Sequence, residues 1–206
     1  RSFLSKLNKK QKIFLDLKLN DIPNTCISAI NSLRSESLAN TDFKSPASVL
    51  NGLNKAFPME AQNLKYFTMW YGVYSQSTKS LKFASAGHPH AILLKKESDK
   101  DDVSLNKLET KGIAIGCFEE AEYREEQVYL ASSNKLYVFS DGVYEITDKN
   151  DHEMTLENFS DLVEKKFCDD NKLQSADIYA EINHMQKVAG PLNDDFSILE
   201  LIFKHN

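Results

Sequence analysis

The stretch KLYVFSDGVYEITD, residues 135–148, decides how the rest of this chain is interpreted. Apolar and aromatic residues at 136–139 lead directly into Ser140, Asp141 and Gly142. Such a run is typical of a strand in a dry core, where an isolated carboxylate at the strand end is costly unless something pairs with it. Asp141 therefore predicts a hydrogen-bonded turn, a nearby cation or a bound metal ion, and this stretch alone leaves all three open.

The composition is that of a soluble globular domain. Hydrophobic residues make up 41% and charged residues 27% of the 206-residue chain, which is ordinary for a folded soluble protein. The net charge of −5 argues against nucleic acid as the main partner, because binding phosphates needs a cationic face. Three widely spaced cysteines favour free thiols over a disulfide framework or a zinc site.

Length and targeting signals predict a single domain, 1–206, of a cytoplasmic protein. No apolar run approaches the ~18 residues of a membrane span, and the polar, basic start at RSFLSK is not a signal peptide. Because the chain starts without methionine, we expect it to be the C-terminal part of a longer regulatory protein with an upstream sensor or receiver domain.

The order of the predicted elements indicates an α+β fold. Alternating apolar residues predict strands at 12–19, 64–75, 80–96, 125–132, 134–140 and 194–204. Helical spacing predicts helices at 23–37, 45–57, 155–167 and 175–188. Strands that cluster between pairs of helices favour antiparallel sheets with helices packed outside, rather than alternating βαβ units. The charged segment 95–107 is expected to be an exposed loop.

Three aspartates lie in or beside apolar strands, namely Asp16, Asp141 and Asp194. Any one of them is most simply a turn former or a cap. Three carboxylates that converged would repel and shift each other's pKa unless a cation joined them. Oxygen ligands of this kind suit Mg²⁺ or Mn²⁺, but the spacing alone does not show that the three converge.

Three short motifs resemble those of the SpoIIE/RsbU-type serine phosphatases, within the metal-dependent PPM class. FASAGHPHAILL at 83–94 is similar to the family's nAGHpPpll strand, and YVFSDGVYEITD at 137–148 is similar to LlYTDGvtEa. NDDFSILEL at 193–201 resembles the C-terminal DDiTllvl. Each motif is weak alone, but the ordered set is specific and the resemblance extends from about Lys12 onward.

The resemblance implies a four-layer α/β/β/α sandwich of two antiparallel sheets flanked by helices, with a site for two Mn²⁺ or Mg²⁺ ions. By match to TDG and DDiT, Asp141 and Asp194 would be metal ligands. Aligning Ile22-Pro23 with the vP of the family's DvsGHGvPAAl puts Asp16 on the metal-bridging aspartate. Leu17 would then offer its backbone carbonyl. The three aspartates would support attack of water on phosphorus, with no phosphoenzyme intermediate.

The first metal loop departs from the family pattern. The family's GHG is Leu19-Asn20-Asp21 here, and its upstream GD aspartate has no clear match. Glycine permits backbone angles that leucine and aspartate resist, so we expect a reshaped loop. Asp21 is either a substitute oxygen ligand or, more simply, a surface-turn residue. His88 is expected to make structural hydrogen bonds rather than to act as a general acid.

The function that the resemblance implies is that of a protein serine/threonine phosphatase domain. Its substrate would be a phosphorylated regulatory protein, similar to an anti-sigma-factor antagonist in a bacterial partner-switching pathway. The alternative is an inactive phosphatase fold that binds a partner in the same kind of pathway, and the altered loop at 19–21 supports it.

Overall fold

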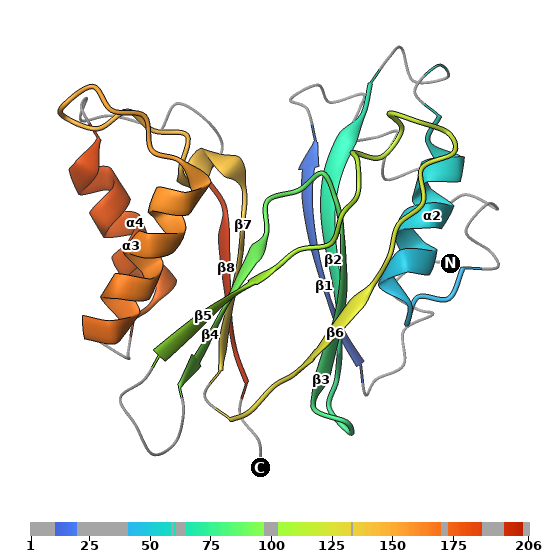
Figure 1. Ribbon diagram of the computed structural model, residues 1–206, viewed down its shortest axis with the longest axis horizontal. Helices are drawn as coiled ribbons and strands as arrows, with labels where there is room; N and C mark the ends of the chain where they lie inside the picture. Colours follow the sequence, from blue (N-terminus) through green and yellow to red (C-terminus); the bar gives the residue numbers. More distant parts are fainter. Residues whose placement is uncertain are drawn as a thin grey trace. The chain divides into compact units, whose positions relative to one another are not determined.

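The described helices and strands form two compact units. The computed structural model describes residues 11–19, 41–58, 60, 65–96, 103–132, 134–169, 173–186 and 196–203, the first of these ranges by its backbone alone. One unit comprises 1–88 and 109–130, and the other comprises 89–108 and 131–206. Each is built on one antiparallel four-stranded sheet (Figure 1). Within the described residues no helix has the length and apolarity needed to cross a membrane.

The first unit is built on a sheet with the spatial order β1-β2-β3-β6. These strands are β1 (Gln11–Leu19), β2 (Phe67–Ser75), β3 (Ser80–Ala86) and β6 (Glu126–Tyr129). Every neighbouring pair is antiparallel. The turn between β2 and β3 lies at residues 76–79, between the predicted strands 64–75 and 80–96, and Lys79 there has a φ of 52°.

Helix α2 (Pro46–Ala56) covers one face of this sheet. It begins where the sequence predicts, because the Ser45 hydroxyl accepts a hydrogen bond from the backbone N–H of Ser48 and Pro46 occupies the first turn. Its apolar residues share one face at helical spacing and pack on alternate residues of β2. The buried residues of this contact are Val49, Leu50, Leu53, Phe57, Phe67, Met69, Tyr71 and Val73.

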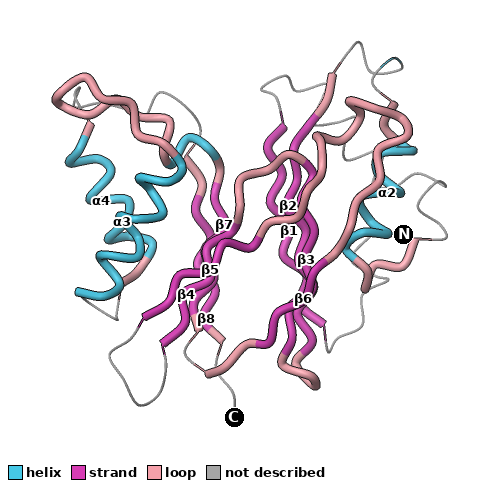
Figure 2. The backbone as a smooth tube through the Cα atoms, viewed as in Figure 1, coloured by secondary structure: helices cyan, strands magenta, loops and turns pink. Residues whose placement is uncertain are grey.

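The second unit is built on a sheet with the order β5-β4-β7-β8. These strands are β5 (Val103–Leu108), β4 (Ala91–Lys96), β7 (Lys135–Phe139) and β8 (Ile198–Ile202). Helices α3 (Leu156–Asp169) and α4 (Ser175–Met185) pack on one face of this sheet, and Figure 2 shows the two helices alongside these strands. All five residues of β7 are buried, and β7 lies inside the sheet, between β4 and β8.

Two predictions about elements are wrong. The stretch 80–96 is not one strand, since β3 and β4 belong to different sheets. The chain leaves β3 at Gly87, whose φ is 66° and where an added Cβ would come within 2.9 Å of the Ala114 nitrogen, so only glycine fits there. The predicted loop at 95–107 contains β5, because Val103 and Leu105 pack on the apolar core and the segment pairs with β4.

The α+β class is confirmed. Two antiparallel sheets with their helices are present, and α2, α4 and β8 lie within their predicted ranges. Helix α3 overlaps its predicted range, 155–167, but extends beyond it to Asp169. The predicted helix at 23–37 lies outside the described residues.

Candidate functional site

Asp141 lies at the end of β7, on a turn that the backbone fixes. The single 3₁₀ turn η4 (Asp141–Val143) follows Ser140 directly. The Asp141 carbonyl accepts hydrogen bonds from the N–H groups of Tyr144 and Glu145, both at 2.9 Å. The Asp141 Oδ1 atom is buried. A buried strand followed by a hydrogen-bonded turn holds this carboxylate in a defined position.

Ser140 joins the end of β7 to the segment that precedes β8. Its N–H donates to the Ser197 carbonyl at 3.0 Å, and its hydroxyl accepts from the Ser197 N–H at 2.9 Å. These bonds continue the β7–β8 register, in which Phe139 pairs with Ile198. The SDG motif and the end of the DDFS motif are therefore fastened together, although they are more than fifty residues apart in the sequence.

Asp16 and Leu17 lie within β1, where the register pairs them with Trp70 and Met69. Met69 faces α2, in the core of the first unit. Trp70 is fully buried and stacks on Phe83, at 6.0 Å between ring centroids. Adjacent residues of a strand point to opposite faces, so Trp70 faces away from α2. Asp16 occupies the register position opposite Trp70.

The described residues test the predicted ligand set only in part. Asp194, its neighbour Asp195 and Asp21 lie outside them. Among the residues whose side chains are described, no three His, Cys, Asp or Glu gather closely enough to hold a metal ion. Asp141 itself fits such an ion, because it presents a buried carboxylate oxygen, the donor type that Mg²⁺ and Mn²⁺ prefer.

The two histidines of the AGHPH segment are buried. The Nε2 atom of His90 lies 3.0 Å from the Ser160 hydroxyl, which donates its own hydrogen to the Leu156 carbonyl at 2.9 Å. His90 is therefore the donor to Ser160. This contact ties β4 to α3, which is a structural role. The His88 carbonyl accepts from the Ser85 hydroxyl at 3.0 Å.

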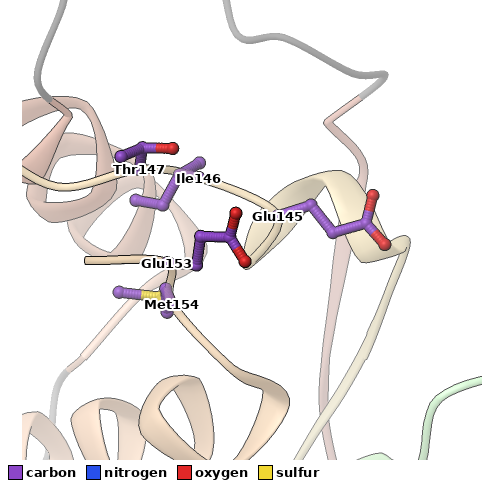
Figure 3. Close-up of a pocket in the computed structure, with 5 residues that line it drawn as sticks. All are labelled: Glu145, Ile146, Thr147, Glu153 and Met154. Carbon is purple, nitrogen blue, oxygen red and sulfur yellow. The ribbon is translucent and has the colours of Figure 1, made fainter. Parts of the chain in front are cut away.

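A pocket of about 340 Å³ lies just after η4, and the sequence analysis did not identify it. The segment folds back so that the Met154 N–H donates to the Ile146 carbonyl at 3.0 Å, and Thr147 pairs with Glu153. Figure 3 shows the five residues that line it, Glu145, Ile146, Thr147, Glu153 and Met154. The one local signal was Asp148-Lys-Asn150, a pattern that favours a side-chain-bonded turn.

The turn beyond the pocket is held by Asp148. Its Oδ1 atom accepts from the N–H groups of Asn150 and His152, at 2.7 and 2.9 Å. The backbone hydrogen bond from His152 is the main cause that holds the pKa of the Asp148 carboxyl below its ordinary value. The residue therefore stays anionic at neutral pH, with Oδ1 committed to the turn.

Comparison with known proteins assigns the chain to a family. The family model described as Stage II sporulation protein E (SpoIIE) matches residues 25–204. The chain is 27% identical over 156 residues to the phosphoserine phosphatase RsbU of Bacillus subtilis (strain 168). The matched region covers 76% of this chain but only 44% of that relative. The chain thus corresponds to less than half the length of the curated relative that it matches.

Solved structures support the fold. The SiaA-PP2C domain of Pseudomonas aeruginosa is similar with a TM-score of 0.67 and 18% identity, over 93% of this chain and 80% of that one. A second structure contains the PP2C phosphatase domain and a fragment of the regulatory domain of SpoIIE from Bacillus subtilis. It is similar with a TM-score of 0.64 and 17% identity, over 95% of this chain and 54% of that one. RsbX, solved in complex with magnesium, is similar with a TM-score of 0.56 and 14% identity, over 94% of this chain and 82% of that one. At these identities the structures show a common PPM fold.

Proposed function

Because the chain belongs to the SpoIIE family of PPM-type phosphatase domains, we propose that it is a metal-dependent serine/threonine phosphatase. The substrate would be a phosphoserine or phosphothreonine on a regulatory protein. The observation that carries the proposal is the placement of Asp141, the residue that matches the family's TDG aspartate, at the fixed end of the buried strand β7.

The metal site would be made of oxygen donors. Asp16, Asp141 and Asp194 would supply carboxylates and Leu17 its backbone carbonyl, to hold Mn²⁺ or Mg²⁺, two ions if the site is complete. The magnesium bound to the fold relative RsbX supports this choice. When bound, such ions activate water and offset the charge that develops on a phosphoryl group.

The protein's own contribution would be to hold the ligands ready. Ser140 and Ser197 fasten the two motifs that carry Asp141 and Asp194. Asp194 is three residues from Ser197, and three residues of extended chain span at most about 11 Å. Covalent connection alone therefore keeps the Cα of Asp194 within about 11 Å of the Cα of Ser197, which is hydrogen-bonded to Ser140 at the end of β7. Fixed ligands need no reorganisation when substrate binds.

A second candidate is an inactive domain that binds a regulatory partner. It is favoured by the end of β1, where Leu19 still pairs with Phe67 as a strand residue. The family has the first glycine of GHG at this position. A strand that continues where relatives turn on glycine would reshape the first metal loop.

The wider setting follows from the relatives. We propose a cytoplasmic role in a bacterial partner-switching pathway, with an anti-sigma-factor antagonist-like phosphoprotein as the substrate. The chain corresponds to only 44% of the RsbU relative, so a sensor or receiver domain upstream in the same protein is part of this proposal.

Hydrolysis of p-nitrophenyl phosphate with added Mn²⁺ tests the proposal. The 206-residue chain should be active, and Asp141→Asn should lower kcat/KM at least about 100-fold, because one anionic ligand is lost. The matched control is Asp161→Asn, an exposed acid on α3 in the same unit, which should retain full activity. Activity that survives Asp141→Asn would refute the role of Asp141. A chain with neither hydrolysis nor Mn²⁺ binding heat would instead be the partner-binding domain.

A further inference from the structure

The pocket at 145–154 begins one turn beyond Asp141. The N–H of Glu145, a pocket-lining residue, donates to the Asp141 carbonyl at 2.9 Å. The pocket volume of about 340 Å³ is at the small end of the range for ligand sites, and suits one long side chain better than a whole cofactor. The backbone hydrogen bond therefore joins the start of the pocket lining to the turn that carries the proposed catalytic aspartate.

The lining combines an apolar surface with one inward carboxylate. Ile146 is 4% exposed and Met154 is partly buried. In Figure 3 the Glu153 carboxylate lies between Met154 and the stem of Glu145, whereas the Glu145 carboxylate points away from the other labelled side chains. The pocket therefore offers aliphatic contact and, at one point, a negative charge.

The charge of the pocket is not neutralised by the described part of the chain. Glu145 and Glu153 are exposed and have no ion-pair partner among the described residues. The only cationic side chains between them are Lys149 and, when protonated, His152, and His152 lies 3.5 Å from Asp148 rather than on either glutamate. A negative, partly apolar pocket disfavours anionic occupants and leaves cationic ones with long aliphatic stems.

We propose that this pocket is a specificity subsite that binds a lysine or arginine side chain of the protein substrate, close in sequence to the phosphorylated residue. The stem would lie on Ile146 and Met154, and the cationic head would meet Glu153. An extended peptide advances about 3.3 Å per residue, so residues two or three positions from the phosphoserine would lie roughly 7–10 Å from it along the chain. The subsite rests on the proposed function for its place in catalysis, but its cation binding is testable by itself.

The kinetic test uses phosphoserine peptides in which one lysine is moved through the three positions on either side of the phosphoserine. Each peptide is paired with one that carries norleucine, which keeps the stem and removes the charge. One lysine position should lower KM about three- to ten-fold relative to norleucine, the range expected of one partly exposed ion pair. Glu153→Gln should abolish this preference without changing kinetics on p-nitrophenyl phosphate, which carries no cationic side chain.

Two control variants separate the pocket from general charge effects. Glu145→Gln should reduce the lysine preference less than Glu153→Gln, because its carboxylate points away from the pocket. Asp161→Asn should leave the preference intact. The absence of any lysine preference in the wild-type chain, or its full retention in Glu153→Gln, would refute the subsite.

A binding measurement keeps the test independent of catalysis. In protein with ¹³C-labelled methionine methyl groups, the Met154 signal is assigned by its loss in Met154→Leu. This signal should shift at an about three- to ten-fold lower concentration of the lysine peptide than of the norleucine peptide. Loss of this difference in Glu153→Gln supports the subsite even in a chain that hydrolyses nothing. If the Met154 signal does not shift on addition of the lysine peptide, the subsite is refuted, whatever the result with p-nitrophenyl phosphate.

Discussion

At the scale of single residues, Ser140 shows how a small side chain can position a larger function. Its hydroxyl is buried and accepts from the Ser197 N–H, while Asp141 follows it on a hydrogen-bonded turn. The family has threonine at this position and at the position of Ser197. A hydroxyl on either residue type can make the same bond, so the chemistry of the contact is retained while a methyl group is lost.

Removing that hydroxyl should weaken metal binding. We expect Ser140→Ala to lower Mn²⁺ affinity about three- to ten-fold in calorimetry, because a positioning contact beside a ligand is lost. It should cost about 1 kcal/mol of unfolding free energy, since the Ser197 N–H loses its side-chain acceptor. Ser140→Thr should restore the affinity.

The control for this variant is Ser160→Ala, which removes another buried hydroxyl of the same unit, one bonded to His90 and Leu156. It should lower stability but not Mn²⁺ affinity. Equal losses of affinity in the two alanine variants would show that Ser140 acts only through stability.

At the scale of elements, Glu125 ties the start of α2 to β3. Its carboxylate accepts from the Ser45 hydroxyl at 2.6 Å, the Ala47 N–H at 3.2 Å and the Lys82 ammonium at 2.8 Å. Partial burial acts to raise the pKa of Glu125, but these hydrogen bonds outweigh it and hold the pKa below its ordinary value. The same residue serves a helix N-terminus, where a negative charge is favourable.

This pKa shift predicts a pH-dependent contribution to stability. A carboxyl with a lower pKa in the folded state stabilises that state above its unfolded pKa of about 4.5, and the contribution is lost as pH falls through the folded pKa. Glu125→Gln should therefore lower the unfolding free energy by about 1 kcal/mol at pH 7. In urea unfolding, the difference in unfolding free energy between Glu125→Gln and the wild-type chain should disappear below about pH 4. A difference in unfolding free energy that is the same at pH 7 and below pH 4 would show that the variant is destabilised by lost packing rather than by the lost charge.

At the scale of the whole molecule, the proposed ligands come from stretches that are far apart in the sequence. Asp16 lies in β1 of the first sheet, and Asp141 follows β7 of the second. If both bind the same metal ions, the effects of their substitution on metal binding should not be additive.

A thermal-shift cycle tests this shared role. Mn²⁺ at about 100 times its dissociation constant should stabilise the wild-type chain by about 2.7 kcal/mol, or roughly 5–10 °C for a chain of this size. Asp16→Asn and Asp141→Asn should each remove most of that shift, and the double variant should lose no more than the larger single loss. An Asp16→Asn variant that keeps the full shift would exclude Asp16 from the site.

The sequence predicted some parts of this molecule better than others, for physical reasons. Helix α2 was predicted because its N-cap, its proline and its apolar stripe are all local. Strand β5 was missed because Val103 and Leu105 lie next to a strongly charged run, and only pairing with β4 compensates for that polarity. The pocket was not predicted because Glu145 and Glu153 line it only after the chain folds back on itself. No periodic pattern in the sequence indicates that reversal.

By itself, the sequence determined the α+β class, the family and the identity of the candidate ligands, because periodicity and short motifs are properties of neighbouring residues. The tertiary structure decided which strands share a sheet, that Ser140 meets Ser197, and that a negative pocket opens one turn beyond Asp141. These features depend on contacts between residues that are distant along the chain. Such contacts are selected by the packing of the whole core, and no local pattern identifies their partners.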